Sequence, residues 1–182
     1  MLTSAQLRFL FQYNLWADHR TLDACAALTN EQFTRHLGSS FGSVRDTVAH
    51  LYGAEWLWNE RFQGRLPSGL PPASVYPDLS AVRAKLEEMD HYYIDFVSNL
   101  TPQDLARIIH YTNLAGEQRS DSVWQILHQL TNHATYHRGQ VVTLLRQLGA
   151  KAVSTDLIRF YHEEPASRER LTLTTPSYSW RD

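Results

Sequence analysis

The chain has 182 residues, of which 43% are apolar and 20% are charged, and its formal net charge is −2. This composition is that of a single globular domain, because a chain of this length can bury a sizeable core. The near-neutral charge, without a basic block, excludes a protein built to neutralise nucleic-acid phosphates. The apolar runs are too short to cross a bilayer, and the N-terminus has helical periodicity instead of a signal peptide's uniform apolar stretch. We therefore expect no membrane association and a cytoplasmic location.

The single cysteine, Cys25, excludes an internal disulfide and a cysteine-rich zinc module. It lies in the helical stretch TLDACAAL, where a small buried thiol is more common than a reactive one. We therefore expect Cys25 in the core, and any bound metal would have to be held by histidine.

The first half of the chain is predicted to contain two long amphipathic helices. Leucine and phenylalanine recur at helical spacing over residues 4–28, and the TNEQ pattern that follows predicts a capping box and a short helical turn. The SVRD pattern at residue 43 predicts the start of a second helix, which continues to about residue 62. The proline-rich stretch QGRLPSGLPPASVYPDLS is predicted to be a loop, because proline blocks helix propagation.

The second half is predicted to add two long helices and a hairpin. A helix is expected over residues 78–100 and is stopped by the Thr-Pro pair that ends at Pro102. Residues 107–120 are rich in β-branched and aromatic residues before a Leu-Ala-Gly turn, which favours a short hairpin. The fourth long helix is expected over residues 122–148, with Gly149 as its C-terminal stop.

Four such helices predict an all-α fold, an antiparallel four-helix bundle with a short hairpin before the fourth helix and a short C-terminal helix in STDLIRFYHEE. We expect one domain over residues 1–164. The tail over residues 165–182 has few apolar residues and is predicted to be a loose arm or a partner contact. The interior of a helical bundle can house a metal site built from side chains of facing helices.

Two histidines, His133 and His137, lie four residues apart in NHATYHRGQ on the predicted fourth helix. At about 100° per residue both point into the stripe of Ile126, Leu130 and Leu144, and their Cβ atoms are about 5 to 6 Å apart, so one ion can reach both. No glutamate separates them, which argues against a zincin protease. The spacing alone leaves two interpretations open, metal ligands or core histidines that hydrogen-bond to each other or to water.

A third ligand is available on the second long helix. His50 borders the apolar side of that helix and can face the fourth one. His128 points about 140° away from His133 and is expected at the surface. The other histidines lie near helix ends, among tyrosines, in irregular segments or near the tail, and we expect them to be solvent-facing or structural: His19, His36, His91, His110 and His162.

Two polar residues could orient an imidazole N–H from outside the ligand set. Gln140 lies about 20° from His133 on the helical wheel, and Asp46 lies one turn before His50. The position of Asp46, three residues after Ser43, favours a role in capping the helix.

The neighbouring residues have simpler interpretations. Tyr136 and Arg138 flank the histidines but point away from them, and we expect both at the surface or in a dimer contact. Asn14 and Trp16 in YNLWAD are predicted to form a packing and hydrogen-bonding motif, although Asn14 could reach the rim of a cavity. The aromatic side chains of the second helix are expected in the core or in a dimer interface: Tyr52, Trp56, Trp58 and Phe62.

The stretches YNLWAD, SVRDTVAHLYGAEWLWNERFQG, NHATYHRGQVVTLLRQLG and STDLIRFY together resemble the DinB/YfiT-like family of metal-dependent enzymes over about residues 5 to 162. The resemblance implies a four-helix bundle, often a homodimer, in which His50, His133 and His137 bind a divalent ion, commonly zinc or nickel. The chain departs from the family pattern at Asp18, where asparagine is frequent, and it lacks proline in GAKAVSTDLI.

Three neutral imidazoles leave an ion its full charge and at least one open coordination position, which is the arrangement of a catalytic site. The resemblance to the family implies a metal-dependent enzyme, either a hydrolase or a low-molecular-weight-thiol S-transferase, whose partner is a small-molecule substrate or thiol. The alternatives are a non-catalytic dimeric metal-binding or ligand-sensing module, and a protein in which no ion binds.

Overall fold

A computed structural model describes residues 1–163 of the chain, so the predicted tail over residues 165–182 lies outside the described residues. The elements follow one another as α1 (Ser4–Cys25), α2 (Asn30–Thr34), α3 (Val44–Phe62), the 3-10 turn η1 (Ala73–Val75), α4 (Leu79–Ser98), α5 (Pro102–Ala106), β1 (Ile108–Thr112), β2 (Gln118–Ser122), α6 (Val123–Gln147) and α7 (Leu157–Glu163).

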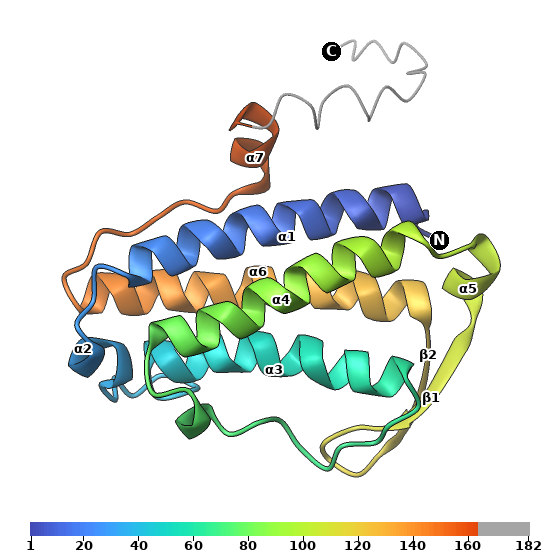
Figure 1. Cartoon of the computed structure of the whole chain (residues 1–182), viewed down its shortest axis with the longest axis horizontal. Coiled ribbons are helices and arrows are strands. Elements are labelled where there is room, and N and C mark those ends of the chain that lie inside the picture. The colour runs from blue at the N-terminus through green and yellow to red at the C-terminus, as the bar shows by residue number, and fades with distance from the viewer. Residues whose placement is uncertain (164–182) are drawn as a thin grey trace, which may run out of the picture.

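The predicted four-helix bundle is confirmed, with α1, α3, α4 and α6 as its long helices (Figure 1). Helix α1 packs against α4 and α6, and α3 packs against the same two helices, so α1 and α3 are diagonal to each other. Helices α3 and α4 run in the direction opposite to α1 and α6, because the long connection through η1 returns the chain to the end where α3 began. Helix α6 therefore has two buried sides, one against α1 and one against α3.

The helices begin where the sequence places capping side chains. The Ser43 hydroxyl accepts a hydrogen bond from the Asp46 amide at 3.1 Å, and Asp78 accepts one from the Ala81 amide at 2.9 Å. These bonds satisfy backbone donors that have no partner inside the helix. Gly149 ends α6 with a φ of 74°, as predicted.

One helix boundary differs from the prediction, and one short helix was not predicted. Helix α1 ends at Cys25, three residues early, because Thr29 takes an extended conformation to cap α2 and the chain must turn before it. The predicted stop at Thr101 is also the start of α5, in which the Thr101 hydroxyl accepts from the Asp104 amide and the Asp104 carboxylate accepts from the Thr101 amide. Proline at the first position of a helix fits this start, because its missing N–H would have no partner there.

The predicted hairpin is confirmed at the end of the bundle. Strands β1 and β2 pair antiparallel, with Ile108 opposite Ser122 and Thr112 opposite Gln118. Gly116 makes the turn with a φ of 83°. Ser122 closes the sheet and also caps α6, so the hairpin is tied directly to the helix that carries two of the candidate histidines.

The core lies between the four long helices and is built of aliphatic and aromatic side chains, among them Leu7, Phe11, Val48, Leu86 and Leu127, each at most 1% exposed. Burying one such side chain stabilises the fold by about 1.5 to 3 kcal/mol. None of the helices within residues 1–163 combines the length and the apolar composition that a membrane span requires.

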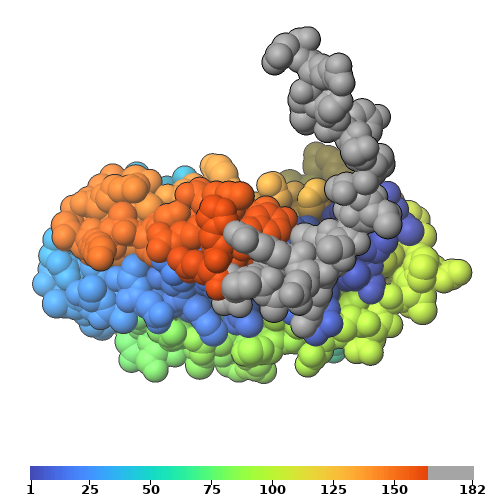
Figure 2. All heavy atoms as spheres, turned by 90° about the horizontal axis from the view of Figure 1, so that it is seen from above, coloured from blue at the N-terminus to red at the C-terminus, as the bar shows by residue number. Residues whose placement is uncertain are grey.

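The predictions for Cys25 and for the aromatic side chains of α3 are borne out. Cys25 is 1% exposed in the core, Tyr52 is 8% exposed, and the other members of the aromatic set pack against the core. Helix α7 packs against α1, where Phe160 contacts the rings of Tyr13 and Trp16. Seen from above, α7 covers part of the surface formed by α1 and α6 (Figure 2).

Candidate metal centre

Three imidazoles meet between α3 and α6. Nε2 of His133 lies 3.2 Å from Nε2 of His50 and 3.0 Å from Nε2 of His137. One ring nitrogen of each residue lies within 4.8 Å of the other two. The two histidines of α6 are one turn apart and His50 comes from the facing helix, so the packing of α3 on α6 creates the cluster.

These separations fit a shared divalent ion. When one ion binds two nitrogens at about 2.0 to 2.1 Å and the angle between the two bonds is about 95° to 105°, the nitrogens lie about 3.0 to 3.3 Å from each other. A nitrogen donor set also suits zinc and nickel better than calcium or magnesium, which prefer oxygen. The residues present therefore fit a three-histidine centre.

The histidines are held in the neutral form that an ion requires. Burial, followed by the neighbouring imidazoles, lowers the pKa of His50 to about 4. Burial and His137 lower the pKa of His133 to about 4, and burial lowers the pKa of His137 itself. Because a protonated imidazole has no free lone pair, these shifts keep the ligand atoms available at neutral pH.

Gln140 orients one of the three rings. Its Oε1 accepts a hydrogen bond from Nδ1 of His137 at 2.7 Å, so the His137 proton resides on Nδ1 and the lone pair on Nε2 faces the cluster. The wheel placed Gln140 nearest to His133, and the structure pairs it with His137 instead. Asp46 follows the capping interpretation: its amide bonds to Ser43 and its carboxylate accepts from Nε of Arg45 at 3.0 Å.

Phe41 covers the cluster and was not predicted. Its ring stacks on His50 with centroids 4.1 Å apart and meets His137 edge-on at 5.2 Å. The loop that carries it is closed by a hydrogen bond from the Leu37 amide to the Gly42 carbonyl at 2.7 Å, and Gly42 has a φ of 80°. A single phenylalanine between two helices carries no periodic signal, so the sequence alone could not reveal this contact.

The other histidines stay away from the cluster, as predicted. His128 is exposed, His19 lies 3.5 Å from Glu87, and His110 bonds to Ser120 at 2.7 Å. Exposed positions are occupied by the rest of the set, namely His36, His91 and His162. Tyr136 is 65% exposed, in agreement with its predicted surface position. Its ring nevertheless meets the His137 ring edge-on, with the two ring centroids 5.0 Å apart.

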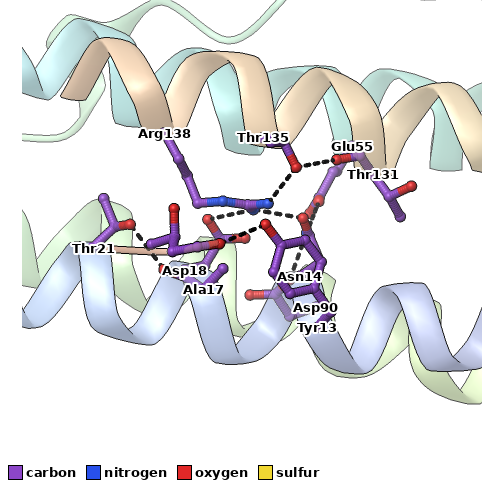
Figure 3. A network of polar contacts seen from close by, with 11 residues as sticks. Tyr13, Asn14, Ala17, Asp18, Thr21, Glu55, Asp90, Thr131, Thr135 and Arg138 are labelled. Carbon is purple, nitrogen blue, oxygen red and sulfur yellow. Dashed lines mark hydrogen bonds and ion pairs between the residues drawn. The ribbon is translucent and has the colours of Figure 1, made fainter. Parts of the chain in front are cut away.

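The prediction that Arg138 lies at the surface is wrong, because its side chain is 0% exposed. Arg138 reaches from α6 toward α1, where Nη1 donates to Asn14 Oδ1 at 2.6 Å and to Asp18 Oδ1 at 3.2 Å (Figure 3). Nη2 donates to the Thr135 hydroxyl at 3.0 Å. The prediction assumes one buried stripe on this helix, whereas α6 packs against both α1 and α3.

Asn14 links this ion pair to two further buried acids. Its amide nitrogen donates to Glu55 at 3.0 Å and to Asp90 at 3.2 Å, which confirms its hydrogen-bonding role. Burial, followed by nearby carboxylates, raises the pKa of both acids well above the usual range. Asp18, Glu55 and Asp90 lie close enough to one another to hold a metal ion. No ion is needed to balance their charge, however, because two of the three carboxyl groups can carry protons and the buried guanidinium of Arg138 then neutralises the third.

The fold and the cluster define a four-helix bundle with a histidine centre between two of its long helices. A sequence model of the DinB family matches residues 1–171, and the chain belongs to that family. The protein DinB of Bacillus subtilis (strain 168) is 27% identical over 155 residues, which cover 81% of this chain and 88% of the relative.

Two solved structures share the fold. A DinB-like protein from Bacillus cereus superposes with a TM-score of 0.60 at 17% identity, covering 80% of this chain and 94% of the other. YfiT from Bacillus subtilis gives a TM-score of 0.63 at 17% identity, covering 83% and 92%, and is described as a probable metal-dependent hydrolase with an unusual four-helix bundle topology.

Proposed function

We propose that this protein is a metal-dependent hydrolase in which Nε2 atoms of His50, His133 and His137 hold one divalent cation, with zinc or nickel as the expected ion. The observation that carries the proposal is the convergence of these three atoms, with separations of 3.2 and 3.0 Å about His133. The description of YfiT as a probable metal-dependent hydrolase supports the same class.

The residues around the cluster have separate tasks in this proposal. Gln140 fixes the tautomer of His137, and the Phe41 ring holds the plane of His50 and keeps water from that side. A cation bound by three neutral ligands supplies a Lewis acid that can lower the pKa of water or polarise a carbonyl group. Because no acidic residue forms a hydrogen bond with the three histidines in the described part of the chain, the cluster adds no negative charge that would oppose this effect.

The ligand set is tested by elemental analysis of purified protein with the variants His137→Ala and His128→Ala. The second variant is the matched control, because His128 lies on the same helix and is exposed. We expect one ion per chain in the wild type and in His128→Ala, and loss of the ion in His137→Ala. Thermal melting before and after chelation should show a lower midpoint only where the ion was present. Equal metal content in all three proteins would refute the ligand set.

The reaction class is tested with protein loaded with zinc or nickel. A hydrolase should cleave activated esters or amides without added thiol, and His137→Ala should abolish turnover. Turnover that appears only with a low-molecular-weight thiol and an electrophile would assign the S-transferase alternative. Metal binding without any turnover would favour the non-catalytic binding or sensing module. The homodimer and the cytoplasmic location stay predictions, and light scattering of the purified protein tests the first.

A further inference from the structure

A second buried arginine, Arg61, differs from Arg138 because it has no negatively charged partner within the described residues. Arg61, in the last turn of α3, is 8% exposed, and within residues 1–163 no carboxylate forms an ion pair with it. Among the acids of the surrounding segments, Glu60 pairs with Arg65 and Glu117 pairs with Arg119. Asp121 accepts from the Tyr111 hydroxyl and forms no ion pair with Arg61. Buried charges are rarely left unpaired, because desolvation costs several kcal/mol that an opposite charge normally offsets.

Neutral groups hold the Arg61 guanidinium in place. The central carbon of the guanidinium lies over both the Trp58 and the Tyr111 rings, at 4.7 Å from each centroid, and Nη2 donates to the Thr112 carbonyl at 2.8 Å. Burial and the bond to Asp121 raise the pKa of Tyr111 to about 12, so this phenol stays neutral and is not a counter-ion. The two rings and the carbonyl fix the orientation of the cation, but they leave its charge uncompensated.

The guanidinium opens into a cavity of about 400 Å³ between the end of α3, the following loop and the hairpin. The walls are mixed: Leu66, Pro67 and Leu114 provide apolar surface, and Ser68 provides a hydroxyl. Arginine carries five N–H donors, and the bond to Thr112 is the one that Arg61 makes within the described residues. The remaining donors are available to a ligand that enters the cavity.

We propose that this cavity binds a small molecule through an oxyanion, a carboxylate or a phosphate, that pairs with Arg61. The planar fork of a guanidinium matches such groups with two parallel hydrogen bonds. The apolar walls would take the aliphatic part of the ligand, and Ser68 could donate a further bond to the anion.

This anion site is separate from the histidine cluster. Arg61 follows His50 by eleven residues on α3, which places it about three turns away, roughly 16 Å along the helix axis, on nearly the same side. The proposal does not depend on a bound metal, so metal-free protein should bind the anion equally well.

Binding is measured by calorimetry and thermal melting of metal-free protein with sodium butyrate or sodium phosphate, against sodium chloride at equal ionic strength. We expect saturable stabilisation by one or both oxyanions, and Arg61→Gln should weaken binding by roughly tenfold or more. Arg119→Gln removes an exposed arginine from the same hairpin and should leave binding unchanged. Saturation by butyrate alone or by phosphate alone would support the proposal and name the oxyanion.

A second variant keeps Arg61 and closes the cavity. Leu114 is 59% exposed, so Leu114→Glu should fold, and its carboxylate would supply the missing negative charge and compete with the ligand. We expect Leu114→Glu to abolish oxyanion binding and Leu114→Gln to retain it. Absence of saturable binding in the wild type, or equal binding by Arg61→Gln and the wild type, would overturn the proposal.

Discussion

Replacement of Arg138 by methionine should destabilise the fold strongly, although the residue lies next to a candidate metal ligand. Arg138 is fully buried and gives three hydrogen bonds, to Asn14 Oδ1, Asp18 Oδ1 and the Thr135 hydroxyl. Methionine follows the first part of the arginine side chain but ends short of the guanidinium, so Arg138→Met removes the charge and the donors and leaves a small space where the guanidinium lay. Its main effect is to strand the buried carboxylate of Asp18.

Breaking a buried ion pair in this way costs about 3 to 5 kcal/mol of the free energy of unfolding. For a domain of this size the same loss lowers the melting midpoint by about 6 to 20 °C. The effect should be measured by urea unfolding of metal-free protein, so that loss of the ion does not contribute. Arg146→Met is the matched control, because Arg146 is exposed on the same helix, and its change should stay within about 0.5 kcal/mol.

The double variant Asp18→Asn/Arg138→Met separates the ion pair from packing. With asparagine at position 18 no charge is stranded, so the double variant should recover at least about 2 kcal/mol relative to Arg138→Met. If Arg138→Met costs less than about 1 kcal/mol, or if the two substitutions are simply additive, Asp18 and Arg138 are not coupled as the structure indicates.

Three further predictions follow from the same geometry. Phe41→Ala removes the ring stacked on His50 and should speed release of the ion to a chelating dye several-fold, with melting little changed; an unchanged release rate would show that the ring does not hold the ligand. The raised pKa values of Glu55 and Asp90 mean that the folded state keeps protons that the unfolded chain loses, so the contribution of these two acids to stability is full below about pH 4 and is lost as pH rises through the folded pKa. Urea unfolding from pH 7 to 9, above the interval in which the cluster histidines titrate, should show this decline, and Asp90→Asn should reduce it; equal slopes would contradict the assignment. Because the pKa of His133 is lowered from 6.5 to about 4, metal-free protein should lose stability as pH falls between these values, and His133→Asn should lose less over that interval when melting is followed by circular dichroism.

Local patterns explain why most of the architecture could be predicted. A cap such as Ser43 acts on the amide of Asp46 three residues away, and the turn at Gly116 needs only its own backbone freedom, so both can be recognised in a short stretch of chain. The end of α1 was placed three residues too late and α5 was missed, although both depend on caps of the same kind. Thr29 and Thr101 each begin a short helix, so the preceding long helix must end before them.

The histidine cluster was predictable in part for a similar reason. His133 and His137 share a helix face by spacing alone, and an apolar position of His50 on its own helix made a meeting with them possible. Spacing could not say which ring Gln140 would orient, because a wheel gives angles about one axis and ignores the rotamers that select between neighbours.

The amino-acid sequence by itself determined the four long helices, the caps at Thr29 and Ser43, the hairpin and the inward face of the histidines, because each depends on residues within a few positions of one another. The tertiary structure alone decided that α6 has a second buried side, where Arg138 meets Asp18 and Asn14. It also decided that Phe41 covers His50 and that Arg61 is enclosed by the hairpin. These contacts join residues from different elements, and their energies depend on burial, which is a property of the assembled bundle.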